Sequence, residues 1–528
     1  MADGFFDESQ GWHPGHNPWA VALTVTLATF MEVMDTSIAN VALPHIAGGL
    51  SAGVDESTWV LTSYLVSNAI VLPISAWLSD RFGRKSFYMS CVGLFTASSF
   101  LCGLAPSLPI LIFFRILQGA GGGGLGPSEQ AILADTFPSK RRGMAFAVYG
   151  MAVVLAPAIG PTLGGWITDH YSWRWIFYVN VPIGLLSLSL TSVMVQDPPH
   201  LERAKQRAKG VPVDFMGLAL VATGLGMLQV VLDKGQRDDW FASTFITIFS
   251  IVSACALVTF VFWEWKQKHP IVELHLFKNP SFAVAAPLMA IVFASLLGCT
   301  VLLPEFVQTQ MGYTAEKAGE VLSPGGFAIL LFMPLVGFLV SRVDARYLIA
   351  LGLGIISASI FNMTHLYLGV DYRTLMMWRV YQAIGMAFIF VPVNTISYND
   401  MPREASNQIS ALMNLMRNVG GSVGISAVTT LLARRQQLHQ NYLAQHLFQY
   451  NPRLQQALSQ LSGHFQQRAD PTQAMQQAYG QISQSVGRQA SVLAYIDVFW
   501  ILGAFSVLAI IFVFFAKKTK PGQVAAGH

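Results

Sequence analysis

The sequence predicts an all-α integral membrane protein of fourteen transmembrane helices, arranged as two six-helix bundles with two further helices inserted between them. Three observations lead to this fold: the composition, the spacing of apolar segments along the chain, and an internal repeat. Of the 528 residues, 53% are hydrophobic and only 11% are charged, whereas soluble domains carry about 25% charged residues. So few charges would leave the surface of a soluble protein of this length largely apolar, so a soluble protein is excluded.

The remaining composition excludes several function classes. The formal net charge is only +4, and the basic residues sit in short clusters between apolar segments, which does not favour a nucleic-acid partner. All four cysteines fall within apolar stretches, so neither a disulfide framework nor a metal-ligand spacing is present, and we expect no metal and no cofactor. We find no phosphate-binding loop, histidine cluster or nucleophile motif, so we do not expect an enzyme. The acidic first eighteen residues are unlike a cleaved signal peptide.

Fourteen apolar segments are each close to the roughly 20 residues that a helix needs to cross a bilayer. They are expected near 19–41, 58–78, 86–105, 109–134, 143–166, 174–195, 214–232, 241–263, 281–303, 317–340, 346–366, 374–398, 405–432 and 491–516. With the N-terminus in the cytoplasm, the inward loops and tail hold nineteen Lys and Arg residues, against five in the six short outward loops. Because basic residues favour the cytoplasmic side, we expect both termini there, in the inner (plasma) membrane.

Two short sequences recur at nearly one offset. Residues 114–119 (FRILQG) match 378–383 (WRVYQA) at an offset of 264, and 76–81 match 337–342 at an offset of 261. Duplicated six-helix halves with a substrate path between them are typical of rocking transporters. The predicted organisation is a cytoplasmic tail (1–18), the N-terminal bundle (19–195), two extra helices (196–270), five helices of the C-terminal bundle (271–432), an extracytoplasmic loop (433–490), the last helix (491–516) and a second cytoplasmic tail (517–528).

The loop between the second and third segments contains Asp80, Arg81, Gly83, Arg84 and Lys85. One interpretation is a basic loop that only sets the topology of the chain. The other is a latch, because an acid, a glycine and three basic residues in so short a turn can also tie neighbouring helices together on the cytoplasmic side.

Charged residues inside apolar helices are the strongest candidates for function. Arg115 lies within the fourth segment, where a charge costs about 2.5 kcal/mol or more unless the side chain reaches the outer surface. Asp35 and Arg115 both lie roughly 9 Å below that surface, so we predict that they pair, either structurally or for proton coupling. Glu32 shares a helix face with Asp35 and is expected to carry a second proton or to contact substrate. Gln118 lies one turn from Arg115.

Glycine and proline mark the fifth segment. Pro157 and Pro161 are expected to kink it, while Gly160, Gly164 and Gly165 allow another helix to approach closely; a generic flexible helix is the simpler reading. Arg379 and Arg417 also lie within segments, and the sequence leaves open whether they pack or line a pore. Two further acids are Glu129, near the inner end of the fourth segment, and Glu305, just past the outer end of the ninth. Acids in such places can sit at a membrane interface without a mechanistic role, and we do not expect a functional role for these two.

Residues 433–490 form the one large polar segment, with sixteen glutamines from Gln436 to Gln489. Two apolar stripes at helical spacing predict two or three amphipathic helices. These helices are expected either to pack on each other or to form a docking surface for another protein. The stripes are Leu454, Leu458, Leu461 and Phe465, and Met475, Tyr479, Ile482 and Val486.

These motifs together resemble those of the fourteen-helix drug:proton antiporters of the major facilitator superfamily, of EmrB/QacA type. Residues 35–44 (DTSIANVALP) resemble the first-helix signature, and 80–85 (DRFGRK) the cytoplasmic loop motif, with Ala76 in place of its leading glycine. Residues 115–119 (RILQG) resemble the fourth-helix motif linked to proton transfer, and 160–165 (GPTLGG) the antiporter motif. The resemblance covers residues 19–432 and 491–516. It implies the major facilitator fold, and it also implies a periplasmic adaptor protein and an outer-membrane channel as partners.

The expected function is therefore proton-coupled efflux of hydrophobic or amphipathic compounds by alternating access. Interior acids and Arg115 suit proton coupling, and the 12% aromatic content suits apolar substrates. Two alternatives stay open. One is a dedicated exporter of a single natural metabolite of fatty-acid or siderophore type, and the other is a membrane scaffold that acts through residues 433–490.

Overall fold

The computed structural model describes residues 15–138, 141–199, 201–202, 213–399, 401–448, 450–467 and 470–518, and within them every regular element is a helix. The N-terminal bundle contains α1 (Pro18–Gly49), α3 (Trp59–Phe82), α4 (Arg84–Leu104), α5 (Leu108–Gly122) continued by α6 (Leu125–Thr136), α7 (Arg142–His170) and α9 (Asn180–Met194). The inserted pair is α11 (Phe215–Lys234) and α12 (Thr244–Lys266). The C-terminal bundle contains α13 (Pro280–Thr309), α14 (Ala315–Leu339), α15 (Ala345–Met363), α16 (Tyr372–Ser397), α17 (Ser406–Gln445) and α19 (Pro471–Val513).

Short helices complete the chain. They are α2 (Val54–Ser57), α8 (Trp175–Tyr178), α18 (Pro452–Phe465) and the 3₁₀ turns Trp240–Ala242, Leu274–Lys278 and Arg403–Ala405. Side chains of Asn and Asp cap many helix starts: Asn17 accepts from the Trp19 amide, Asp214 from Gly217 and Asp470 from Thr472. Where such a cap is present, it explains why the helix begins at the polar residue that precedes the apolar segment.

Each of the fourteen expected segments falls on a helix. Twelve helices among the described residues are long and apolar enough to cross a membrane, and α7, which bends by 45° between Arg142–Pro157 and Thr162–His170, makes a thirteenth. The fourteenth, α17, is more polar because it buries Asn407, Asn414 and Arg417 between the two bundles. The all-α membrane fold predicted from the sequence is confirmed.

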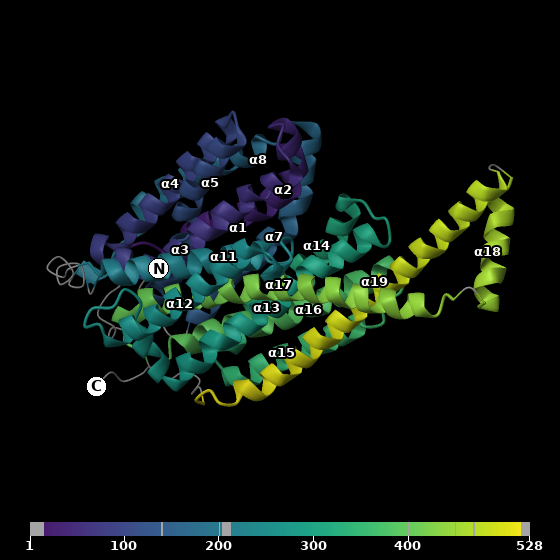
Figure 1. Ribbon diagram of the computed structural model, residues 1–528. Coiled ribbons are helices and arrows are strands. Elements are labelled where there is room, and N and C mark those ends of the chain that lie inside the picture. Colours follow the sequence, from purple (N-terminus) through teal and green to yellow (C-terminus); the bar gives the residue numbers. More distant parts are fainter. Residues whose placement is uncertain are drawn as a thin grey trace.

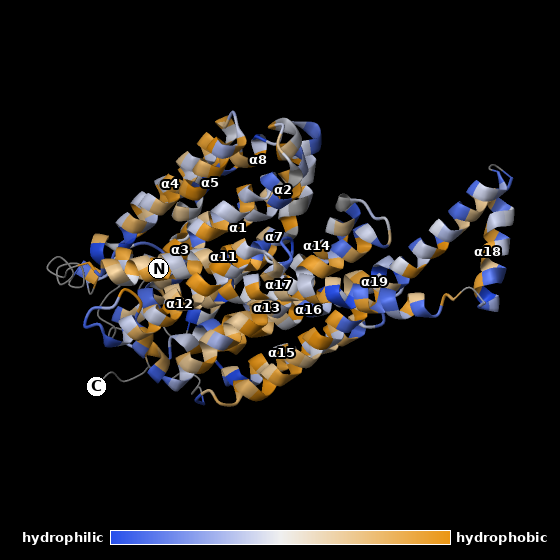
Figure 2. Cartoon of the chain, viewed as in Figure 1, coloured by the Kyte–Doolittle hydropathy of each residue, from blue (hydrophilic) through white to orange (hydrophobic). Residues whose placement is uncertain are grey.

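The two bundles meet along a limited set of helices. From the N-terminal bundle, α3, α6 and α7 pack against α14, α16 and α17 of the C-terminal bundle (Figure 1). The inserted helix α11 packs on α3 and α17 and carries α12 at the periphery. The exposed side of α12 shows Ile248, Ile251 and Phe262, which suits a helix that faces lipid (Figure 2).

A helical extension projects from the membrane region. It consists of the last turns of α17, all of α18 and the first turns of α19 (Figure 1), and it is far more hydrophilic than the rest (Figure 2). Leu454 and Leu458 of α18 pack on Ala478 of α19, so the first predicted stripe is used within the extension. Met475 and Tyr479 of the second stripe remain exposed, at 41% and 53%.

One ionic cluster lies where the extension joins the membrane helices. Asp497 of α19 accepts from His439 of α17 at 2.8 Å, and its Oδ2 lies 3.5 Å from a guanidinium nitrogen of Arg435. Both long helices run through this junction without a break.

Several helix ends differ from the expected segments, and one of them concerns a residue singled out in the sequence. Glu305 lies inside α13, which continues to Thr309, and not beyond the end of that helix. The sequence suggests an end at Pro304, but a transmembrane helix tolerates proline because neighbouring groups satisfy the freed carbonyl. The expected cytoplasmic loop 196–213 and both tails lie largely outside the described residues.

Candidate functional site

A fully buried ion pair lies in the N-terminal bundle. Arg115 of α5 donates from Nη1 to Oδ2 of Asp35 on α1 at 2.6 Å. Arg115 is 0% exposed and Asp35 is 2% exposed. The pairing predicted from matched depth is therefore present, and snorkelling of Arg115 to the surface is excluded.

Two amides complete the coordination of the Asp35 carboxylate. Gln118 donates to Oδ1 at 3.0 Å and Asn180 of α9 donates to the same oxygen at 2.7 Å. Gln118 also accepts from Arg115 Nη1 at 2.8 Å, and Asn180 is held by Ser99 at 3.0 Å. These bonds lower the cost of burying the carboxylate, whereas Arg115 Nη2 has no hydrogen-bond partner among the described residues. Helices α1, α5 and α9 thus meet at one carboxylate, and α4 is connected to it through Asn180.

Aromatic rings enclose the guanidinium. The Arg115 Cζ atom lies 4.3 Å from the ring centre of Tyr64 and 5.7 Å from that of Phe177, within the range of cation–π attraction. Arg115 Nε donates to the Val60 carbonyl at 3.0 Å. Arg115 is therefore anchored by partners other than Asp35.

Tyr64 links this pair to Glu32. Its hydroxyl donates to Glu32 Oε1 at 3.1 Å, and Asn68 donates to the same oxygen at 3.3 Å. Asn68 in turn accepts from Asn418 of α17 at 3.2 Å. Glu32, predicted as a second acid near Asp35, therefore lies on a polar path that leads from the ion pair to the other bundle.

Close helix contacts explain several of the glycines. A Cβ atom on Gly119 would lie 2.3 Å from the Tyr64 carbonyl, and one on Gly160 would lie 2.5 Å from Ser37. A Cβ atom on Gly164 would meet Ile38 at 3.0 Å. Gly160 and Gly164 therefore press α7 against α1 beside Asp35. At Gly165 nothing lies within 4 Å, and of Pro161 only the helical backbone is described.

The cytoplasmic loop motif is built into helix contacts. Arg84 pairs with Asp135 of α6 at 2.8 Å, both side chains being 2% exposed. Lys85 donates to the Ser192 carbonyl at 2.6 Å, and Arg81 stacks over Trp77. Gly83 joins α3 to α4 with a φ of 91°, which favours glycine.

Contacts from this region cross to the other bundle. Asn407 of α17 donates to Asp80 at 2.5 Å, and Ser406 donates to Asp135 at 3.1 Å. The loop motif thus reaches both bundles on one side of the molecule.

A second inter-bundle network lies deeper. Gln130 of α6 donates to Asn394 at 2.9 Å and accepts from Asn414 at 2.8 Å. Tyr149 of α7 donates to Asn414 at 3.0 Å and is itself contacted by Arg417. All five side chains are buried. Arg417 therefore belongs to a contact between the bundles.

The other predicted residues lie elsewhere. Arg379 of α16 is bonded to Gln382, outside the Asp35 network. Glu129 is fully buried and accepts from Thr26 at 2.6 Å. Among the described residues, no group of three His, Cys, Asp or Glu side chains is placed to hold a metal ion.

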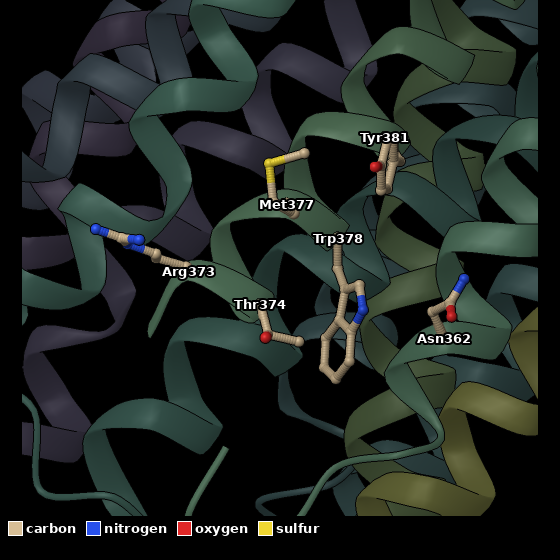
Figure 3. A pocket seen from close by; sticks show the side chains of 6 residues that line it. All are labelled: Asn362, Arg373, Thr374, Met377, Trp378 and Tyr381. Carbon is tan, nitrogen blue, oxygen red and sulfur yellow. The ribbon is translucent and has the colours of Figure 1, made fainter. Parts of the chain in front are cut away.

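A pocket of about 260 Å³ opens between α15 and α16 (Figure 3). Trp378, Tyr381 and Asn362 surround it, while Arg373 points away from them. Trp378 and Tyr381 belong to the repeated sequence 378–383, but none of the candidate site residues lines the pocket.

Sequence reasoning missed Asn180, Tyr64, Gln130, Asn394 and Asn414. Each is an uncharged polar residue within an apolar segment, and such residues carry no signal of their own. The matched depth that revealed the Asp35–Arg115 pair depended on the high cost of burying charge, and no equivalent penalty marks an amide or a phenol.

Comparisons with known proteins identify the family of the chain. Residues 25–425 match the Major Facilitator Superfamily family. The multidrug export protein EmrB of Haemophilus influenzae is 36% identical over 503 residues, covering 94% of this chain and 95% of that protein. The fatty acid resistance protein FarB of Neisseria gonorrhoeae is 36% identical over 501 residues, covering 95% and 96%. EmrB of Escherichia coli K12 is 34% identical over 498 residues, covering 94% and 95%.

Among solved structures, the proton:xylose symporter XylE superimposes with a TM-score of 0.60 at 16% identity, covering 96% of this chain and 97% of that one. This likeness shows the transporter fold alone. The sequence relatives are closer and extend over the whole membrane region. The chain belongs to the major facilitator superfamily of membrane transporters, and within it to the EmrB-like drug:proton antiporters.

Proposed function

We propose that the protein exports a range of hydrophobic or amphipathic compounds in exchange for protons, by alternating access between its two bundles. The observation that carries this proposal is the buried Asp35–Arg115 pair with its amide partners Gln118 and Asn180. A membrane scaffold needs no ion pair in its interior, where buried charge is costly.

The pair provides a switch because only one partner can lose its charge. Arg115 stays protonated in proteins, whereas Asp35 can take up a proton. A proton on Asp35 removes the negative charge and weakens its attraction to Nη1 of Arg115. Arg115 keeps its hydrogen bonds to Val60 and Gln118 and therefore stays in place. The helix that is free to shift is α1, which carries Asp35 and packs against α7.

This change in α1 is the proposed link to alternating access. Protonation from the outer side favours the inward-facing state, and proton release to the cytoplasm allows polar or cationic groups of a substrate to bind. Glu32 carries the second proton or contacts substrate, since Tyr64 places it next to the pair and Asn68 connects it to α17.

The test is pH-gradient-driven transport of a fluorescent dye in proteoliposomes. Asp35→Asn is expected to abolish gradient-driven transport while the protein still inserts and folds. Arg115→Lys is expected to impair it, because lysine keeps the charge but loses the planar fork of donors. Asp371→Asn is the matched control, since asparagine replaces aspartate well as the N-cap of α16. Transport by Asp35→Asn at the wild-type rate would assign coupling to another acid, with Glu32 the next candidate.

A second candidate function is dedicated export of one fatty-acid-like metabolite. The 36% identity to FarB, a fatty acid resistance protein, favours it. A panel of unrelated toxic compounds in an efflux-deficient host separates the two. Resistance to several chemical classes supports multidrug export, and resistance confined to fatty acids supports the dedicated exporter.

The placement proposed is the inner membrane with both termini cytoplasmic, supported by the distribution of basic residues. The extension of α17, α18 and α19 then lies outside, where its exposed Met475 and Tyr479 suit docking of a periplasmic adaptor that leads to an outer-membrane channel. Tags at the C-terminus that are labelled from outside intact cells would contradict this topology.

A further inference from the structure

The internal repeat places a second arginine at the position that Arg115 holds in the N-terminal bundle. Arg379 follows Arg115 by 264 residues, and each is followed three residues later by a glutamine, Gln382 or Gln118. Arg379 lies seven residues after Tyr372, the first residue of α16, as Arg115 lies seven residues after Leu108, the first of α5. Both are therefore roughly 10 Å along their helices.

Among the described residues of the second bundle, no acid pairs with Arg379 as Asp35 pairs with Arg115. The residue 264 positions after Asp35 is Cys299, on α13, the first helix of the C-terminal bundle. Its thiol lies beside Gln382 and Arg379. The arrangement of the arginine, the glutamine and the first helix of the bundle is thus repeated. In the C-terminal bundle, however, the neutral thiol of Cys299 takes the position that the Asp35 carboxylate has in the N-terminal bundle.

This replacement leaves charge and donors unsatisfied. Arg379 Nη1 bonds to Gln382 Oε1 at 2.5 Å, but Arg379 Nε and Gln382 Nε2 are buried without a hydrogen-bond partner among the described residues. Arg115 also has one such nitrogen, Nη2, but its Nε donates to a carbonyl and its charge is balanced by Asp35. Within the described part of the chain Arg379 forms no ion pair, while Gln382 is 0% exposed. A cation and amide donors buried in this way favour a ligand that brings a negative charge.

Neighbouring helices do not cover the Arg379 residue completely, although its Nε is buried. Arg379 remains partly exposed. The neighbouring helix α14 passes it at Gly325, where a Cβ atom would lie 3.2 Å from Arg379 Cγ. The absence of a side chain at Gly325 keeps α14 from covering the arginine further.

We propose that Arg379 and Gln382 bind the carboxylate group of an amphipathic anionic substrate, at the place where Cys299 replaces an acid. This site rests on the proposed export function. A carboxylate matches the fork of arginine donors, and its single negative charge balances the single charge of Arg379. A phosphate dianion would leave an uncompensated charge of its own, so the carboxylate is the better fit.

The experiment measures equilibrium binding of radiolabelled decanoate to the purified full-length protein in lipid nanodiscs. Cys299→Asp supplies an internal carboxylate to Arg379, and Cys299→Asn is the matched neutral control. Cys299→Asp and Arg379→Gln are expected to weaken decanoate binding by about 10- to 100-fold, the range for a hydrogen bond to a charged group. Cys299→Asn is expected to stay within about threefold of wild type. Binding of a cationic dye to the same variants, unchanged within about threefold, shows that each is folded.

Three results would overturn the site. The first is an unchanged affinity of Cys299→Asp for decanoate. The second is binding of decanol as tightly as decanoate. The third is displacement of decanoate by chloride at equal concentration, which would indicate a site for inorganic anions. Failure of the proposed function is a separate result. Proton-driven dye transport would be absent in proteoliposomes, whatever the affinity for decanoate.

Discussion

The buried hydrogen-bond network between the two bundles can be tested as the interaction that keeps the bundles joined. Asn414 makes two inter-bundle hydrogen bonds, as donor to Gln130 at 2.8 Å and as acceptor from Tyr149 at 3.0 Å. Replacing it with leucine, which has a similar volume, removes both bonds while the bundles stay joined. Gln130 Oε1 and the Tyr149 hydroxyl proton then lose these partners in a buried place.

The expected size of the effect follows from that loss. Each buried polar group left without a partner costs about 1–3 kcal/mol, but water satisfies both groups once the bundles separate on this side. Asn414→Leu therefore destabilises the joined state by about 2 kcal/mol or more, which shifts the equilibrium toward separation roughly 30-fold.

Spin labels on α6 and α17, one on each bundle, report the separation as a distance distribution. The matched control is Asn362→Leu, since Asn362 is exposed and, among the described residues, donates to the Ala358 carbonyl of its own helix at 2.8 Å and to no residue of the other bundle. A distribution for Asn414→Leu that matches both wild type and control would refute the reasoning. It would mean that apolar packing between α7 and α14, and not the amide network, holds the bundles together.

Three further predictions concern other parts of the molecule. Gly160→Leu is expected to lower the thermal unfolding midpoint in detergent by several degrees, since overpacking costs about 1–3 kcal/mol. Gly165→Ala is the control and should match wild type, because there is open space beside Gly165. Equal midpoints for the two variants would contradict the close contact of Gly160 with α1. Arg84→Gln removes the buried ion-pair partner of Asp135 and should lower the free energy of unfolding by about 3 kcal/mol, measured by chemical denaturation. A decrease of less than about 0.5 kcal/mol would mean that the ion pair contributes little to stability. Deleting residues 440–485 should leave a folded protein but reduce resistance in cells; unchanged resistance would exclude a docking role for the extension.

The sequence predicts this fold well because the membrane imposes strong constraints. Apolar length gave the fourteen helices, and the cost of a buried charge identified Asp35 and Arg115. The same reasoning did not reach Asn180 or Asn414, whose neutral amides carry no comparable penalty and are identified only by their partners in space. It also divided α17 and α19 where their composition changes from apolar to glutamine-rich, although glutamine is a good helix former and the backbone continues through both changes.

The unbroken course of α19 has a mechanical consequence. At 43 residues it is about 65 Å long, and it belongs at one end to the C-terminal bundle and at the other to the extension (Figure 1). Asp497 fastens it to α17 where the two leave the bundle. If the C-terminal bundle rocks as a rigid body, this lever carries α18 with it, and a tilt of about 10° moves the far end of the rod by roughly 11 Å. A protein bound to α18 would therefore be moved in step with each transport cycle.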